Sequence, residues 1–218
     1  MQIRTDAHPA AAPLPPTPGQ TIGPFFGYAT AHEQVYLPFR GGEHLVPPAH
    51  PRAMRLTGTV YDGNGSPVPD AMLEIWQADE LGEIPQRSGS LVRDGWTFTG
   101  WGRVAVDNEG TYSFSTVRPG ATEPGRAAFI HLVIFARGLP NKLHTRIYLP
   151  EDEEALAADP LLCSVDASRR STLIGQREED GALRFDIWLQ GMGENSHRET
   201  VFLQFPGTDY PENHRGTA

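Results

Sequence analysis

Arg137 is the residue whose type and place in the sequence best suit ligand binding. It follows a run of apolar residues, 129–135, and precedes Gly138. An arginine at the end of a strand can hold a carboxylate through two parallel hydrogen bonds, because its planar fork matches the two oxygens. The same side chain could instead form an ordinary surface ion pair, and the sequence leaves both interpretations open.

Two histidines could contribute to a metal site. His131 shares a predicted strand face with apolar residues, where a lone histidine is more often a core residue than a ligand. His144, Arg146 and Tyr148 alternate along a second predicted strand, so they share one face and could line a pocket or brace a hydrogen-bond network. With a carboxylate, His131 and His144 could bind iron(II). Nothing in the sequence places a carboxylate beside them.

Composition limits the classes of function. The 218 residues, of which 39% are hydrophobic, suffice for one large domain or two small ones. A net charge of -9 disfavours nucleic-acid binding, because phosphate contacts need a basic surface. The single cysteine, Cys163, excludes an internal disulfide and a cysteine-based zinc site, and it suits a reducing compartment. No signal peptide or membrane-spanning run is recognisable, so we expect a cytoplasmic protein.

Many short strands separated by turns predict an all-β protein with a single sandwich. Strands are predicted at 55–61, 71–77, 111–115, 129–135, 143–149, 182–190 and 200–205. Turns are predicted at 62–65 and 107–110, which are rich in Asp, Asn and Gly. The nearly continuous apolar run 129–135 predicts a central strand covered on both faces. Frequent turns with little helix are typical of a sandwich or barrel.

The rest of the chain is predicted to be loops, a little helix and two loose ends. Short helices are predicted at 151–158, after Pro150, and at 166–173, where Asp166 could act as a cap. Residues 80–102 show little periodicity and predict a long loop. Residues 1–18 are rich in proline and predict an extended arm, residues 19–205 the sandwich, and residues 206–218 a polar tail.

Three stretches of sequence resemble the intradiol ring-cleaving dioxygenases. The first is the hairpin 60–79, whose Trp-Gln-Ala-Asp ending at 76–79 is quite specific to that family. The second, 110–120, ends in Arg-Pro-Gly, and the third, 130–148, contains Phe-Ala-Arg-Gly and His-Thr-Arg-Ile-Tyr. With Gln-Thr-Ile-Gly-Pro at 20–24, the resemblance covers residues 17–205. The start and the Phe-Ala-Arg-Gly stretch are similar to the α-type chain of the family's two-chain members.

The same resemblance implies that this chain has lost the family's metal ligands. Iron-bearing members hold iron(III) with two tyrosines and two histidines, because phenolates neutralise a hard and highly charged ion. Here Ile84 stands at the position implied for the first tyrosine, and Ala121-Thr122 at the second. The His-x-His pair is replaced by Phe129 and His131. Since one imidazole cannot hold iron(III) against water, we expect no metal in this chain.

An iron-free member implies a required subunit with no catalytic residue of its own. By resemblance, a homologous β-type partner holds Fe(III), and the complex opens protocatechuate (3,4-dihydroxybenzoate) with O2 to 3-carboxy-cis,cis-muconate. Arg137 would bind the substrate carboxylate, and Thr21, Gly23 and Pro24 would border the same pocket or form an ordinary turn. Phe25 lacks the hydroxyl of the tyrosine that often follows Gly-Pro in such chains, so it cannot make that side chain's hydrogen bond.

Two other functions are compatible with the sequence. The hairpin 60–79 is also similar to prealbumin-like domains, so the chain could be a binding module without chemistry. A self-sufficient dioxygenase with an atypical metal site, built from His131, His144 and a carboxylate, is the third interpretation. A partner chain that carries two tyrosines and a His-x-His would favour the subunit over both.

Overall fold

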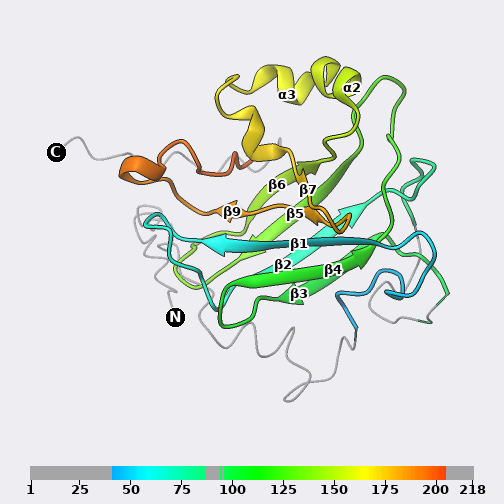
Figure 1. The fold of residues 1–218 in the computed structure, drawn as a ribbon, viewed down its shortest axis with the longest axis horizontal. Coiled ribbons are helices and arrows are strands. Elements are labelled where there is room, and N and C mark those ends of the chain that lie inside the picture. Colours follow the sequence, from blue (N-terminus) through cyan, green and yellow to red (C-terminus); the bar gives the residue numbers. More distant parts are fainter. Residues whose placement is uncertain (1–40, 87–93, 95, 205–218) are drawn as a thin grey trace, which may run out of the picture.

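Strands of the chain form two sheets that pack face to face (Figure 1). The structure is a computed structural model and describes residues 41–86, 94 and 96–204. One sheet has the order β3-β2-β5-β6 and is antiparallel throughout. Its strands are β2 (Met72–Gln77), β3 (Trp101–Ala105), β5 (Phe129–Phe135) and β6 (Leu143–Tyr148).

The second sheet is built around β1, which pairs with strands from both halves of the chain. Its order is β4-β1-β8-β7, and β9 also pairs with β1. The strands are β1 (Met54–Tyr61), β4 (Thr111–Thr116), β7 (Gln176–Arg177), β8 (Leu183–Arg184) and β9 (Ile187–Trp188). Strand β4 is antiparallel to β1, whereas β8 and β9 are parallel to it.

The main hydrophobic core lies between the two sheets. Alternate residues of β1 and β2, such as Leu56, Leu73 and Ile75, are fully buried there. Burial of one face per sheet is what period-two apolar patterning dictates. A smaller cluster of Ala127, Tyr148, Leu162 and Leu173 lies under the helical segments that follow β6. The all-β sandwich with little helix is therefore confirmed.

Most predicted strands are confirmed with shifts of one residue at their ends, and β5 has the predicted bounds. Both predicted turns are present. Asp62 and Asp107 each accept hydrogen bonds from backbone N–H groups two and four residues later, which closes the turn. Strand β5 lies between β2 and β6, so its central position is also confirmed.

The predicted strand 182–190 is wrong as a single element, because its ladder with β1 is broken into β8 and β9. At the break, side chains take the bonds that a continuous parallel ladder would make. The Thr59 N–H donates to Asp186 Oδ1 (3.0 Å), and the Phe185 carbonyl accepts from Tyr112 Oη (2.6 Å). Gly58 lies at this crossing, where an added Cβ would be 1.9 Å from the Phe185 oxygen. The apolar side chains of the segment nevertheless face the core as predicted.

Two further strand predictions differ from the structure. Strand β3 occupies residues 101–105, so the predicted loop ends two residues earlier than expected, and no strand had been predicted there. The segment 200–204 is not a strand. It is held by single hydrogen bonds, such as Thr200 N to Trp188 O (3.0 Å) and Leu203 N to His144 O (2.7 Å), which do not make a ladder. Phe205 lies outside the described residues.

The helical region after β6 contains three short elements instead of two. Helix α2 (Glu153–Ala158) agrees with the prediction and is capped by Asp152. Helix α3 (Pro160–Ser164) was not predicted, and its cap Asp159 accepts from the N–H groups of Leu161 and Leu162. The predicted helix 166–173 is reduced to the 3₁₀ turn η1 (Arg170–Leu173), which Asp166 does not cap. A second 3₁₀ turn, η2 (Gly193–Asn195), follows β9.

Several sequence predictions fall on residues that the structure does not describe. The arm 1–18 and the tail 206–218 lie outside the described ranges, as do Thr21, Gly23, Pro24 and Phe25. Their roles therefore stay predictions. Within the described ranges, no helix combines the length and the apolar character that a membrane crossing requires.

Candidate functional site

The loops after β2 and β4 pack against each other at the positions where the two tyrosines are missing. The Gly120 N–H donates to the Asp79 carbonyl (2.7 Å). Gly82 has φ +85°, and a Cβ there would lie 2.0 Å from the Ala121 oxygen, so this contact requires glycine. Ile84 is 62% exposed. The structure thus brings the two loops together, but the first position carries an apolar, exposed side chain.

A cavity of about 250 Å³ lies beside the second missing tyrosine. It is lined by Thr122, Glu123, Arg126, Phe129, Arg146 and Asp159. Thr122 and Phe129 stand where the family pattern implies a tyrosine and a histidine ligand. By the family resemblance, this cavity is the place in the chain that would correspond to an iron site, and we call it the vestigial cleft.

A guanidinium group takes part in the wall of the vestigial cleft. The Cζ atom of Arg146 lies 3.8 Å from the centre of the Phe129 ring, in cation–π contact. Arg146 Nη1 donates to Tyr148 Oη (3.2 Å), and Tyr148 Oη donates to Asp159 Oδ1 (3.1 Å). Burial raises the pKa of Tyr148 to about 12, so the phenol stays neutral. A fixed cation beside the lost ligands opposes the entry of a metal ion.

His131, the remaining ligand position, is engaged by a second imidazole. Its Nε2 lies 3.1 Å from Nδ1 of His144, and the two rings meet edge to face. The pKa of His131 is lowered to about 4, mainly by burial and to a lesser extent by the charges of His144, Arg146 and Lys142. Burial also lowers the pKa of His144. Both rings are therefore neutral at pH 7, and one proton can be shared along the contact.

These residues do not fit iron(III). Of the four positions that the resemblance implies, three carry Ile84, Ala121-Thr122 and Phe129, none of which offers a phenolate or an imidazole. Within residues 41–86, 94 and 96–204, no group of three or more His, Cys, Asp and Glu is placed to hold a metal ion. The structure brings His131 and His144 together, as a metalloenzyme would need, but not with a carboxylate among the described residues.

Arg137 lies far from the vestigial cleft. It occupies the turn after β5, whereas Phe129 begins that strand, and six residue steps of about 3.3 Å make β5 about 20 Å long. The Arg137 side chain is 61% exposed, and its Nε lies 3.0 Å from Oδ2 of Asp70, which is 23% exposed. Arg137 is therefore presented at the surface, where it can reach another chain but not the cleft of its own.

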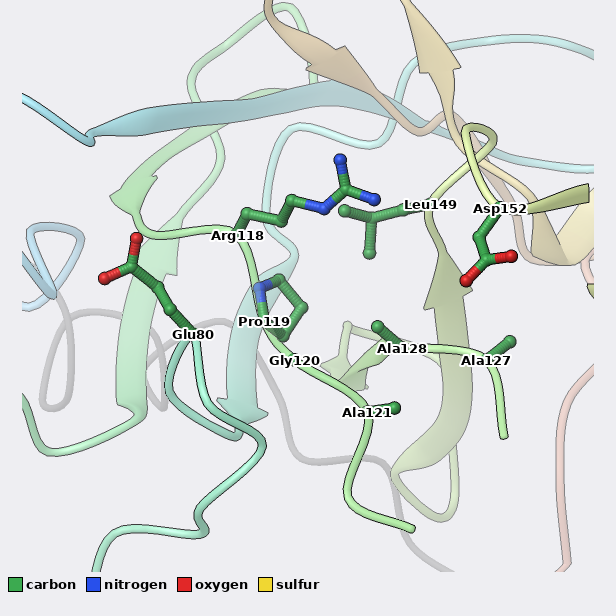
Figure 2. A pocket seen from close by; sticks show the side chains of 9 residues that line it. All are labelled: Glu80, Arg118, Pro119, Gly120, Ala121, Ala127, Ala128, Leu149 and Asp152. Atoms are coloured by element: carbon green, nitrogen blue, oxygen red, sulfur yellow. The ribbon is translucent and has the colours of Figure 1, made fainter. Parts of the chain in front are cut away.

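A second cavity, of about 370 Å³, lies between the packed loops and the end of β6 (Figure 2). It is lined by Glu80, Arg118, Pro119, Gly120, Ala121, Ala127, Ala128, Leu149 and Asp152. In Figure 2, Arg118 reaches across small residues toward Leu149, and Asp152 lies on the far side. Arg118 is half-exposed and only loosely paired with Glu151 (3.8 Å). Asp152 is occupied in capping α2, so this cavity holds no pair of groups arranged for acid–base chemistry.

Comparison with known proteins identifies the family. The family model described as "Dioxygenase" matches residues 22–191. A protocatechuate 3,4-dioxygenase alpha chain from Pseudomonas putida is 40% identical over 205 residues, covering 88% of this chain and 98% of the relative. The chain belongs to the intradiol dioxygenase family. An alpha chain of the same name from Burkholderia cepacia is 34% identical over 208 residues, covering 87% and 98%.

A solved structure agrees with this family assignment at the level of the fold. An intradiol ring-cleavage dioxygenase from Tetranychus urticae superposes with a TM-score of 0.50 at 20% identity, covering 69% of this chain and 84% of that one. Within this family, the packed loops and the vestigial cleft are the intradiol scaffold without its ligands.

Sequence reasoning named some of these residues and missed others. It grouped His144, Arg146 and Tyr148 on one strand face, and the structure places Arg146 and Tyr148 in one hydrogen-bonded chain. It did not single out Asp159 or Asp70. Asp159 follows two turns of helix and precedes Pro160, which is the pattern of a cap. Asp70 precedes β2 by two residues, and only strand pairing shows that it faces Arg137.

Proposed function

We propose that the chain is the iron-free alpha subunit of a protocatechuate 3,4-dioxygenase. The observation that carries the proposal is the vestigial cleft, in which Arg146 lies against Phe129, at a position where the resemblance implies a histidine ligand. The identity of 34–40% to alpha chains over nearly their whole length supports it. Such a chain acts through a homologous beta subunit that supplies Fe(III).

In this proposal, Fe(III) held by the partner subunit would supply the activation of the catechol toward O2. This chain would complete the wall of that pocket. Arg137 would hold the carboxylate of protocatechuate, because a guanidinium fork and a carboxylate match in shape and charge. Thr21, Gly23 and Pro24 would border the same pocket and exclude water. With its single cysteine, Cys163, in a free and exposed state, the protein would work in the cytoplasm.

The position of Arg137 supports a role at a partner's pocket. Its side chain is exposed at the opposite end of β5 from the vestigial cleft, so a ligand held by it would not lie in this chain's own cleft. The net charge of -9 gives no long-range attraction to an anionic substrate, so any binding there must come from direct contact with the guanidinium.

Purification of the chain alone and together with its beta partner tests the assignment. We expect iron only in the complex, with the visible absorption of iron–phenolate and cleavage of protocatechuate. An isolated chain that carries stoichiometric iron and cleaves rings would refute the subunit role. A chain that never associates with an iron-bearing homologue would favour a binding module.

Replacement of Arg137 by alanine in the complex tests the carboxylate role. The KM for protocatechuate should rise about tenfold or more, since a charge-assisted contact is worth roughly 1.5–3 kcal/mol. The KM for catechol, which lacks the carboxylate, should change little. Arg55→Ala is a matched control, because Arg55 also forms a half-exposed ion pair, with Asp180. Equal effects of Arg137→Ala on both substrates would remove the carboxylate role.

A further inference from the structure

Asp70 and Arg137 form an ion pair at one end of the β2–β5 ladder. The closest approach joins Oδ2 of Asp70 to Nε of Arg137, at 3.0 Å. The carboxylate therefore lies on the Nε side of the planar guanidinium. The end of the fork, formed by Nη1 and Nη2, is on the other side of the group, and the arginine side chain is 61% exposed. A second carboxylate can approach that end.

The pair follows from strand register. Strands β2 and β5 are antiparallel, and Met72 is opposite Phe135. Two residues beyond this pair on each strand, Asp70 stands opposite Arg137. Asp70 ends the turn that leads into β2, and Arg137 begins the turn that leaves β5. Both turns adjoin the last pair of the same ladder, which brings the two side chains close together.

We infer that Asp70 is a positioning residue for the substrate carboxylate, acting through Arg137. The inference rests on the proposed function of Arg137. An exposed arginine has many accessible rotamers, and an ion pair at Nε selects those that keep Nε on Asp70 and leave the end of the fork for another carboxylate. Substrate then binds a fork that is already oriented, which is the general advantage of preorganisation.

Asp70 also adds a negative charge close to the incoming carboxylate. This charge weakens the binding of any anion that lacks directed hydrogen bonds to the fork, so the pair selects a carboxylate in the correct orientation. The two effects separate by substitution. Asp70→Asn keeps an acceptor oxygen but removes the charge, whereas Asp70→Ala removes both.

Steady-state kinetics of the assembled αβ complex test the inference. We expect Asp70→Ala to raise the KM for protocatechuate about fivefold, the equivalent of one oriented hydrogen bond. The value of kcat and the KM for catechol should stay within about twofold. Asp70→Asn should have a smaller effect than Asp70→Ala. In an Arg137→Ala background, Asp70→Ala should have no further effect, because the group that it orients is gone. Asp180→Ala is the matched control for loss of an exposed ion pair.

Several results would overturn the inference. An unchanged or lowered KM for protocatechuate in Asp70→Ala, or equal changes for protocatechuate and catechol, would show that Asp70 does not orient Arg137. Thermal unfolding of each complex checks folding, and Asp70→Asn repeats the comparison with a nearly isosteric side chain. If Arg137→Ala itself fails to distinguish the two substrates, the proposed carboxylate role of Arg137 is wrong, and the present inference falls with it. If Arg137→Ala raises the KM for protocatechuate more than that for catechol, and Asp70→Ala does not, only the present inference fails.

Discussion

Acidification should destabilise this chain through the His131–His144 contact. The folded state holds the pKa of His131 at about 4, against 6.5 for the free side chain. Between these values the unfolded chain binds a proton that the folded chain does not. Stability from this group is therefore complete above pH 6.5 and is lost as the pH falls toward 4. His144 contributes with the same sign, since burial lowers its pKa as well.

The size of the effect follows from the shift and the exposure of the ring. One pKa unit corresponds to about 1.4 kcal/mol, so the complete loss has an upper bound of about 3 kcal/mol. At pH 5 the ring is mostly protonated in the unfolded chain and mostly neutral in the folded chain. The loss of unfolding free energy by pH 5 is therefore about 2 kcal/mol before any correction for solvent. Because the ring is partly exposed, solvent screening reduces this to about 1 kcal/mol.

Urea unfolding at pH 7.5 and pH 5.0, followed by tryptophan fluorescence, measures this loss. Other groups titrate in the same range, so the informative quantity is the difference between wild type and His131→Gln. We expect the variant to lose about 1 kcal/mol less than wild type between the two pH values. His197→Gln is the control, because His197 is exposed, and it should follow wild type. If His131→Gln also follows wild type, His131 is not held neutral by the fold, and the reasoning fails.

Three further predictions concern the contacts that hold the candidate site in place. Gly82→Ala should lower the free energy of unfolding by at least about 2 kcal/mol, because the added Cβ would lie 2.0 Å from a backbone oxygen. Gly181→Ala is the control: Gly181 has a similar φ but no atom within 4 Å of an added Cβ, so the change should cost only about 1 kcal/mol. Tyr112→Phe should cost about 1–3 kcal/mol in urea unfolding, because it leaves a buried carbonyl without its 2.6 Å donor; a cost near zero would contradict this. Asp159→Ala should lower the free energy of unfolding by about 2–4 kcal/mol, because Asp159 is 1% exposed and accepts three hydrogen bonds. Asp166 is exposed, so the control Asp166→Ala should cost under about 1 kcal/mol.

Local sequence predicted the strands whose patterns arise from one buried face. In β2, Leu73 and Ile75 alternate with Glu74 and Trp76, and the structure places Leu73 and Ile75 in the core. Turns were equally local, because a single aspartate such as Asp62 closes one with its own side chain. The expected loss of the iron ligands is likewise a prediction from sequence, since it depends only on which residue types stand in a known motif.

Other elements could not be predicted because they depend on partners distant in the chain. Strand β3 has weak periodicity and is a strand because β2 offers it an edge with matching backbone groups. The break between β8 and β9 arises where Tyr112 and Asp186 take over ladder bonds, and neither contact is visible from the segment itself. Helix α3, by contrast, has a local signal in its cap Asp159 followed by Pro160, and sequence reasoning missed it.

For the candidate site, residue types and tertiary geometry decided different things. The sequence, through its family resemblance, led us to expect that this chain lacks the two phenolates and two imidazoles of an iron site, because ligand chemistry requires particular side chains. Only the tertiary structure decided what stands there instead, the Arg146 guanidinium against Phe129, and that Arg137 faces Asp70 at the far end of β5. Both contacts depend on strand pairing: Arg146 lies diagonally across the β5–β6 ladder from Phe129, and Asp70 and Arg137 lie just beyond the last pair of the β2–β5 ladder.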